Sequence, residues 1–319
     1  MRRSTLSFLL LSVMAQWGLA FVAIRVLVDH ASAVTITLIR FLIAGAALAG
    51  VMALARQRYP RLRRQDRWRV LVIALVSVIT YHLALNFGEH YVSAGVASLI
   101  VAAAPVMTAV LSARVLHERV PPAKAFGIAA ALAGVAVLVV GGADGDLRIE
   151  NVGGALVTAI APLSFAVSTV TAKPIVPRYG ALPLTTLSLL LGTAILFPFA
   201  LPATVGDLSR LDGADWGRLA FLGVGCTAYA YWVWNRALMA FEASSVAPWT
   251  YLVPVFALGW AALLLGERVT ALSALGGVMV LGGVILTERV APRLAARRQA
   301  ARATALEDSD DTGRVRLQP

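Results

Sequence analysis

Ten long apolar runs divide the chain, and they constrain its fold more than any other feature. They cover residues 6–28, 34–55, 70–88, 93–113, 123–141, 152–172, 182–202, 217–238, 244–266 and 270–288. A helix needs about 20 mainly apolar residues to cross a bilayer, and most of these runs have that length. Within lipid, only helices and closed barrels hydrogen-bond all of their backbone groups. We therefore predict an all-α integral membrane protein with ten transmembrane helices and the lipid bilayer as its solvent.

The positions of the charges predict how these helices are oriented. Charged residues make up only 14% of the chain, against about 25% in soluble domains. The segment RQRYPRLRRQDRWR (56–69) carries seven arginines, whereas GGADGDLRIE (141–150) and DLSRLDGADW (207–216) are rich in aspartate. Since cytoplasmic loops are enriched in Lys and Arg, we expect both termini in the cytoplasm. The net charge of +11 then reports topology, and we expect no nucleic-acid partner.

The two ends of the chain need separate treatment. The start, MRRSTLSFLLLSVMAQWGLA, imitates a signal peptide, but its apolar character continues to Val28. That length suits a membrane span, so we expect the segment to be retained as the first helix. Residues 289–319 turn from basic to acidic and lack apolar periodicity. We expect this segment to be a disordered cytoplasmic tail.

A repeated phrase indicates how the runs are organised. VPVFALGWAALLLGERV (253–269) repeats APVMTAVLSARVLHERV (104–120) at an offset of 149 residues. The match is strong over runs 3–5 against 8–10 and faint over the others. Each copy holds five runs, an odd number, so the second copy must enter the membrane from the opposite side. We predict two inverted five-helix repeats, residues 5–140 and 152–288, as in carriers that work by alternating access.

Longer stretches also carry a family resemblance. They are WGLAFVAIR (17–25), TLIRFLIAG (37–45), SAGVASLIVAAAPVMTAVLSARVLHERV (93–120) and APWTYLVPVFALGWAALLLGERVT (247–270). Together they resemble the ten-span EamA-type transporters of the drug/metabolite transporter (DMT) superfamily, over roughly residues 5–288. The resemblance implies a multi-pass protein of the bacterial inner membrane that exports amino acids or related small metabolites. Two alternatives stay open: import or exchange of sugars or organic cations, and a receptor or sensor that transports nothing. Whether two copies form a homodimer is also left open.

A polar stripe recurs in both repeats at membrane depth. His82 and Asn86 are four residues apart and share one helix face, and Tyr231 and Asn235 match them in the second copy. Such residues face a cavity or hydrogen-bond to another helix. Aromatic residues add apolar walls of the kind that suits a ligand. We predict a small-molecule substrate cavity formed by Gln16, Trp17, His82, Asn86, Thr227, Tyr231, Asn235 and Trp249.

Two arginines fall within or near the end of a run, namely Arg40 and Arg25. A charged side chain at the bilayer centre costs about 2.5–3.5 kcal/mol on insertion scales. Two interpretations stay open: the guanidinium binds a substrate carboxylate, or it snorkels outward or pairs with an acid such as Asp29 or Glu89. At the offset of the repeated phrase the residue that matches Arg40 is Leu189, so the repeat does not support the first interpretation.

Prolines and glutamates of the repeated phrase are candidate moving parts. Pro105 and Pro254 each remove a backbone donor within a run and so either form a hinge or fix a kink. Glu118 and Glu267 end their runs and either form gate ion pairs or cap the next short helix. The sequence has no Gly-rich phosphate loop and no cluster with metal-ligand spacing. We therefore expect no cofactor, no metal and no enzymatic activity.

Overall fold

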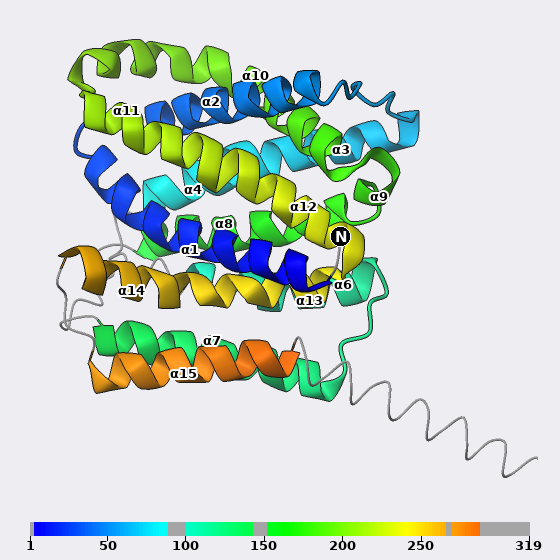
Figure 1. Ribbon diagram of the computed structural model, residues 1–319, viewed down its shortest axis with the longest axis vertical. Coiled ribbons are helices and arrows are strands. Elements are labelled where there is room, and N and C mark those ends of the chain that lie inside the picture. Colours follow the sequence, from blue (N-terminus) through cyan, green and yellow to red (C-terminus); the bar gives the residue numbers. More distant parts are fainter. Residues whose placement is uncertain (1–2, 89–99, 143–151, 266–269, 288–319) are drawn as a thin grey trace, which may run out of the picture.

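The computed structural model describes residues 3–88, 100–142, 152–265 and 270–287 (Figure 1). Within these ranges every regular element is helical, and there is no strand. This agrees with the expected all-α fold, because a helix satisfies its own backbone hydrogen bonds in lipid, whereas an open sheet edge leaves backbone groups unpaired. The predicted tail, 289–319, lies outside the described residues.

The α-helices follow one another along the chain in numerical order. They are α1 (Arg3–Leu27), α2 (Ala33–Leu54), α3 (Arg67–Ile73), α4 (Tyr81–Gly88), α6 (Ala104–Val115), α7 (Pro122–Gly142), α8 (Val152–Ala172), α9 (Val176–Tyr179), α10 (Ala181–Asp207), α11 (Gly213–Ala220), α12 (Ala230–Ala240), α13 (Ala243–Val246), α14 (Leu252–Leu265) and α15 (Ala271–Ile285). Short 3₁₀ segments are η1 (Arg64–Asp66), η3 (Leu208–Arg210) and η5 (Ala247–Tyr251), and π-helical segments are η2 (Ala74–Thr80) and η4 (Phe221–Tyr229).

Seven helical segments of the described chain are long and apolar enough to cross a membrane. They are Ser4–Ile24, Ala33–Leu54, Arg64–Phe87, Pro122–Gly141, Gly153–Ala172, Ala181–Arg210 and Ala243–Leu264. Two further apolar helices, α6 and α15, are shorter. The run 217–238 falls within α11, η4 and α12, which follow one another without a break. These segments agree with a multi-pass membrane protein, and the number of ten spans stays a prediction.

Large apolar side chains are exposed on the outside of the long helices. Phe8, Phe126, Phe199 and Leu263 are each exposed over two thirds or more of their area. Scattered exposed apolar residues are normal, but extended exposed apolar surface marks an interface with a partner or with lipid. Since the exposed side chains lie on helices long enough to span, lipid is the partner that fits.

Helices that match each other in the repeat also pack against each other. α7 lies beside α15 at one edge of the bundle, and α2 lies beside α10 near the opposite edge (Figure 1). The packing of α1 against α14 is likewise matched by that of α8 against α6. These contacts place matching segments, which lie far apart in sequence, at the interface between the two halves of the chain.

The contact between α7 and α15 depends on four glycines. A Cβ atom on Gly127 would lie 2.9 Å from the Gly283 carbonyl oxygen, and one on Gly134 would lie 2.9 Å from the Gly276 carbonyl oxygen. The lower-numbered glycine of α7 therefore meets the higher-numbered glycine of α15, so the two helices run antiparallel. Small residues allow this close approach, which van der Waals packing stabilises in a membrane.

Two carboxylates outside the apolar runs tie the halves of the chain together in matching ways. Asp66 accepts a hydrogen bond of 2.5 Å from Arg178, a residue of the second half. Asp215 matches Asp66 at the offset of the repeated phrase, and it lies 2.7 Å from Nδ1 of His30, a residue of the first half. Both carboxylates are buried. Each tie thus joins the two halves. The partners of Asp66 in the other half are Arg178 and Tyr179, and the partner of Asp215 in the other half is His30.

Candidate functional site

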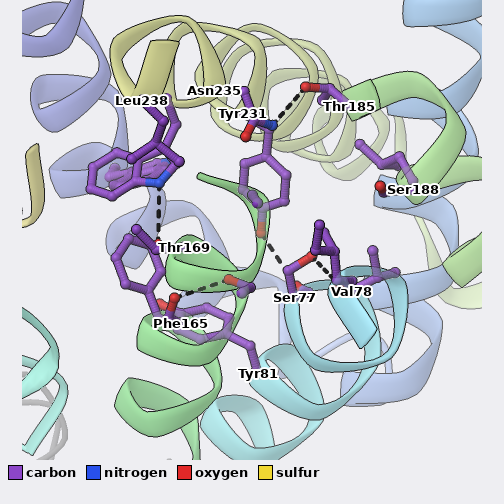
Figure 2. Close-up of a pocket in the computed structure, with 16 residues that line it drawn as sticks. Ser77, Val78, Tyr81, Phe165, Thr169, Thr185, Ser188, Tyr231, Asn235 and Leu238 are labelled. Carbon is purple, nitrogen blue, oxygen red and sulfur yellow. Dashed lines mark hydrogen bonds between the residues drawn. The ribbon is translucent and has the colours of Figure 1, made fainter. Parts of the chain in front are cut away.

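A cavity of about 50 Å³ lies between α1, η2, α8, α10 and α12 (Figure 2). Its described lining consists of Trp17, Ile73, Ser77, Val78, Tyr81, Phe165, Ser168, Thr169, Ala172, Thr185, Ser188, Leu189, Tyr231, Trp234, Asn235 and Leu238. None of these side chains is charged at neutral pH. The site therefore combines apolar and aromatic walls with a few hydroxyl and amide groups, which is the usual make-up of a small-molecule pocket.

Four aromatic side chains form one wall. The rings of Phe165 and Trp234 are 4.9 Å apart at 61°, and Trp17 lies 6.3 Å from Phe165 at 81°. Tyr81 continues the wall at 6.2 Å from Phe165. These spacings are typical of edge-to-face and tilted aromatic pairs. The wall is suited to an apolar or unsaturated part of a ligand.

Hydroxyl and amide groups of α10 and α12 form the opposite wall. Asn235 donates a hydrogen bond of 2.8 Å from Nδ2 to the hydroxyl of Thr185, as Figure 2 shows. The hydroxyl of Ser188, one helical turn later, is buried and has no hydrogen-bond partner among the described residues. A buried polar group without a partner is unfavourable, so this hydroxyl is available to a ligand or to water.

Tyr231 connects the cavity with the interior behind it. Its hydroxyl oxygen lies 3.0 Å from Nε2 of His82 and donates at 3.4 Å to the carbonyl of Ser77. His82 itself is buried and packs edge-on against Phe41 at 4.9 Å. The histidine predicted to line the cavity therefore lies one layer behind it, covered by Tyr231.

Two backbone carbonyls of the π-helical segments accept hydrogen bonds from side chains here. η2 and η4 begin at Ala74 and Phe221 and interrupt the regular ladder of their helices. The carbonyl of Ser77 in η2 accepts the Tyr231 bond, and that of Cys226 in η4 accepts a bond of 2.9 Å from Nε1 of Trp17. Single π turns within α-helices occur often at functional sites.

Arg40 lies behind the cavity and does not line it. The side chain is 6% exposed, and its Nε atom donates a bond of 2.6 Å to the hydroxyl of Thr227. A second, longer bond of 3.5 Å runs from Nη2 to the carbonyl of Cys226. None of the ion pairs between described residues includes Arg40. The guanidinium also lies 5.9 Å from the centre of the Phe41 ring, so each of these partners within the described part of the chain is a neutral group.

The remaining predicted cavity residues occupy different places. Asn86 is buried and donates a bond of 3.2 Å to the hydroxyl of Thr37. Gln16 packs against Gly225 of η4, and Trp249 lies in η5 against the main apolar core. Of the predicted residues, three belong to the described lining of the cavity, namely Trp17, Tyr231 and Asn235. Two predictions lie outside the described residues: the side chain of Arg25, whose backbone is in α1, and the whole of Glu267.

The sequence pattern did not predict the part of the cavity formed by α8 and α10. Thr185 and Ser188 of α10, and Phe165, Ser168 and Thr169 of α8, all line it. On an apolar span, single Ser and Thr residues give a weak signal, because their hydroxyls usually bond to the carbonyl of the preceding turn. Thr185 itself makes such a bond, to Ala181, while its oxygen also accepts from Asn235.

The repeated prolines lie in the first turns of helical segments. Pro105 is the second residue of α6, after a turn at residues 102–103. Pro254 is the third residue of α14, after the 3₁₀ segment η5. A proline in the first turn removes an N–H group that would have no helical partner anyway. Both sites thus join two short helical segments within one apolar run.

Glu118 joins the end of α6 to the start of α13. Its carboxylate accepts bonds of 2.8 Å from the backbone N–H of Ala243, 3.0 Å from that of Ser244 and 2.7 Å from the Ser244 hydroxyl. Burial alone would raise the pKa of Glu118, but these hydrogen bonds and nearby Lys124 lower it below its ordinary value. Lys124 in turn donates a bond of 2.8 Å to Glu242. The Glu118 carboxylate therefore caps α13 of the second half, and not the next helix along the chain, α7, and it connects the two halves of the chain.

A second cation extends this cluster to the cavity. Lys173 directly follows Ala172, which lines the cavity, and donates to the carbonyls of Leu238 and Phe241 at the end of α12. Burial lowers the pKa of Lys173, and Glu118 and Glu242 partly offset that effect. The charged cluster of Glu118, Lys124, Lys173 and Glu242 thus lies next to one end of the cavity. No group of three or more His, Cys, Asp or Glu that could hold a metal occurs among the described residues.

The sequence profile of the EamA-like transporter family matches this chain twice, over residues 4–140 and 152–289. The chain belongs to that family. The two matches together cover most of the chain, and the cavity is lined by residues from both.

Related EamA-like proteins agree with this assignment. The chain is 33% identical to a "probable terminal-alkyne amino-acid exporter" of Streptantibioticus cattleyicolor, over 91% of this chain and 95% of the relative. It is 32% identical to an "uncharacterized transporter" of Archaeoglobus fulgidus, over 86% and 95%. It is 30% identical to a "probable amino-acid metabolite efflux pump" of Escherichia coli, over 87% and 93%. These names indicate a membrane transporter, which is not an enzyme.

The fold has a counterpart among solved structures of proteins. One crystal structure superposes with a TM-score of 0.77 at 21% identity, over 92% of this chain and 99% of the other. At that identity the likeness is informative about the fold alone. It agrees with the helical bundle described above for the EamA-like chain.

Proposed function

We propose that this protein is a secondary-active exporter of amino acids or related small metabolites in a bacterial inner membrane. The observation that carries the proposal is the uncharged cavity with its aromatic wall and its hydroxyl and amide wall, found in a chain of the EamA-like family. The aromatic wall suits an apolar or unsaturated side chain, and the Thr185–Asn235 wall suits a polar head group. The names of the relatives from S. cattleyicolor and E. coli support the same substrate class.

The size of the cavity is relevant to the mechanism. Ligand pockets commonly measure about 300–1,000 Å³, whereas this cavity has about 50 Å³, room for only a few water molecules. An amino acid therefore requires the helices around Trp17 and Tyr231 to separate. This requirement favours a carrier that changes conformation during each transport cycle, rather than a permanently open pore.

Our proposal includes ten spans in two inverted five-helix repeats with cytoplasmic termini. The antiparallel contact between α7 and α15 supports inversion, because these helices match at the offset of the repeated phrase. The glycine contacts support a two-fold axis, since Gly127 with Gly283 maps onto Gly276 with Gly134 at that offset. Inverted repeats allow the two halves to exchange conformations, which is alternating access.

The repeated phrase supplies the parts that move in this proposal. The Glu118 tether joins the halves beside one end of the cavity and would have to break when that end opens. Glu267 is proposed to do the same at the other face. Pro105 and Pro254 would act as hinges, because each joins two helical segments by a residue without an N–H group.

Counterflow in proteoliposomes tests the proposal. Vesicles with purified protein are loaded with one unlabelled amino acid and then given the same amino acid in labelled form, across all twenty and a set of sugars and amines. We expect accumulation of apolar amino acids, and a lower internal pool in cells that overproduce the protein. Counterflow of sugars or amines alone would favour the importer or exchanger, and binding without counterflow would favour the sensor.

A further inference from the structure

We propose that Thr37, Arg40, Asn86 and Thr227 form a second half of the substrate site, closed in this structure, in which the Arg40 guanidinium binds a carboxylate of the substrate. This inference rests on the proposed alternating access. It assigns a binding role to residues that do not line the present cavity, and it adds a charge requirement to a site that is otherwise neutral.

One amide-to-hydroxyl hydrogen bond occurs at a matching place in each half of the chain. Asn235 donates to Thr185 at 2.8 Å, and Asn86 donates to Thr37 at 3.2 Å. Asn235 follows Asn86 at the offset of the repeated phrase, and Thr185 follows Thr37 at an offset shorter by one. The same amide-to-hydroxyl bond thus joins the second and third apolar runs of each half. The pairs are equivalent, and the offset changes by one position between these two runs.

At the shorter offset, Arg40 matches Ser188. One helical turn after Thr185 lies Ser188, and one turn after Thr37 lies Arg40. The contact of Trp17 with Phe165 fits the same shorter offset, which also separates these two residues. Arg40 therefore corresponds to Ser188, whose buried hydroxyl lines the cavity without a partner among the described residues.

The two equivalent regions differ in whether they line the cavity. Thr185, Ser188 and Asn235 line the cavity, whereas Thr37, Arg40 and Asn86 are buried and do not line it. If the halves exchange conformations, the open and the packed regions exchange as well. The cavity that faces the other side would then be lined by the second set. Thr227 would join that set, because it matches the lining residue Val78 at the offset of the repeated phrase.

The surroundings of Arg40 indicate which chemical group of a ligand it would bind. A buried cation is strongly unfavourable unless an anion or well-placed acceptors compensate it. Among the described residues Arg40 donates to the Thr227 hydroxyl and, in a long bond, to the Cys226 carbonyl, and its guanidinium lies 5.9 Å from the centre of the Phe41 ring. None of these partners is an anion. Its guanidinium is a planar fork of five donors that matches the two oxygens of a carboxylate. Tyr231 and His82 now separate it from the cavity. When they part, a substrate carboxylate would find a cation that has no anionic partner among the described residues.

Cysteine accessibility tests the closed half-site. Cys226 is the only cysteine, so Cys226→Ser gives the background for Thr185→Cys, Asn235→Cys, Thr37→Cys and Asn86→Cys. We expect a membrane-impermeant maleimide to label the first two from one face of the membrane and the last two from the other. Ala131→Cys, in the fully buried α7 contact, is the control that should stay unlabelled. Labelling of all four from one face, or none at Thr37→Cys and Asn86→Cys, would overturn the second half-site.

Ligand binding tests the charge requirement. Thermal shifts of the wild type are measured with the twenty L-amino acids and with their amides, which lack the carboxylate. We expect acids to bind at least about tenfold more tightly than amides, as for hydrogen bonds to charged groups. Arg40→Gln should remove that preference, and Arg40→Lys should keep part of it. Arg210→Gln, which removes a charge from an exposed side chain, should change nothing.

The outcomes separate the two levels of the proposal. If the wild type binds acids and amides equally, or Arg40→Gln keeps the preference, the role of Arg40 is wrong while export stands. If no amino acid binds and none shows counterflow, the proposed function itself is wrong. Labelling is scored on protein that keeps Arg40, so it stays informative if Arg40→Gln does not fold.

Discussion

Nε2 of His82 lies 3.0 Å from the hydroxyl oxygen of Tyr231, its own counterpart in the second half of the chain, 149 residues later. Two equivalent residues of a repeat can meet each other only at the axis that relates the repeats. Trp17 and Phe165, which match at the offset shorter by one, also meet, with ring centres 6.3 Å apart. Each contact includes a residue that lines the cavity, so they support a proposed two-fold axis that passes through the substrate site.

Removal of the Tyr231 hydroxyl should weaken both the fold and transport. Tyr231→Phe leaves Nε2 of buried His82 without its partner, and an unsatisfied buried polar group costs about 1–3 kcal/mol. We expect a lower melting temperature in detergent and slower counterflow. Tyr59→Phe, which removes the hydroxyl of a half-exposed tyrosine, is the matched control. Equal melting temperatures for Tyr231→Phe and the wild type would show that the pair contributes nothing.

Neighbouring glycines of α15 offer a clean test of the α7–α15 contact. A Cβ atom on Gly276 would overlap the backbone of Leu138, whereas one on Gly277 would meet nothing within 4 Å. Gly276→Ala should therefore destabilise the protein by about 1–3 kcal/mol, as overpacking does in other cores. Gly277→Ala should be neutral. Unfolding in a denaturing detergent measures both, and similar curves for the two variants would contradict the close antiparallel contact.

The Glu118 tether should depend on pH only in the acid range. Its pKa is lower in the folded protein than its ordinary value, so its contribution is complete above the unfolded pKa of about 4.3. The contribution is lost as pH falls through the folded pKa. We expect the Glu118 contribution to be constant between about pH 6 and 8 and wild-type stability to fall below about pH 4. Glu118→Gln should melt lower at neutral pH and lose part of the acid-dependent step. An unchanged acid step in that variant would be evidence against the tether.

The aromatic wall should set affinity for the apolar part of the substrate. Phe165 packs against both Trp17 and Trp234 and lines the cavity. Phe165→Leu keeps the site apolar but removes the ring contacts, each worth about 0.5–1.5 kcal/mol. We expect the apparent affinity for an apolar amino acid in counterflow to fall about three- to tenfold. Phe199→Leu, at a lipid-exposed position, serves as control, and an equal loss there would contradict the assigned wall.

The sequence was sufficient to predict the helical class, because runs of about 20 apolar residues leave few other folds in lipid. It also pointed to Trp17, Tyr231 and Asn235, which line the cavity, because aromatic and amide side chains stand out within apolar runs. Their contact with a substrate stays a prediction. It could not identify Thr185 and Ser188, whose hydroxyls are common on ordinary apolar helices. The match between Arg40 and Ser188 was hidden because the 149-residue offset of the repeated phrase pairs Arg40 with Leu189. Only the offset shorter by one pairs Arg40 with Ser188. No residue pattern in the sequence predicted the π-helical segments η2 and η4.

The two matched carboxylate ties yield a prediction about direction. Asp66 accepts hydrogen bonds from Arg178 and Tyr179. Burial alone would raise the pKa of Asp215, but hydrogen bonds from His30, the backbone of Asp212 and Arg218 lower it below its ordinary value, so this carboxylate stays charged at neutral pH. If Asp66 lies at the cytoplasmic face and Asp215 at the outer face, loss of either charge should loosen the halves at that face only. Asp66→Asn should therefore favour opening to the cytoplasm, and Asp215→Asn opening to the outside.

Labelling of introduced cysteines measures this shift. In the Cys226→Ser background, Asp66→Asn should raise the rate of maleimide labelling at Asn235→Cys and lower it at Asn86→Cys, and Asp215→Asn should do the reverse. Arg210→Gln serves again as a charge control at an exposed site. If both aspartate variants shift the two rates in the same direction, the ties stabilise the fold in general and do not act at opposite faces. Shifts of the labelling rates in opposite directions for the two aspartate variants would support the two-fold relationship. In that arrangement, a tie that holds one face of the membrane closed has an equivalent tie at the other face.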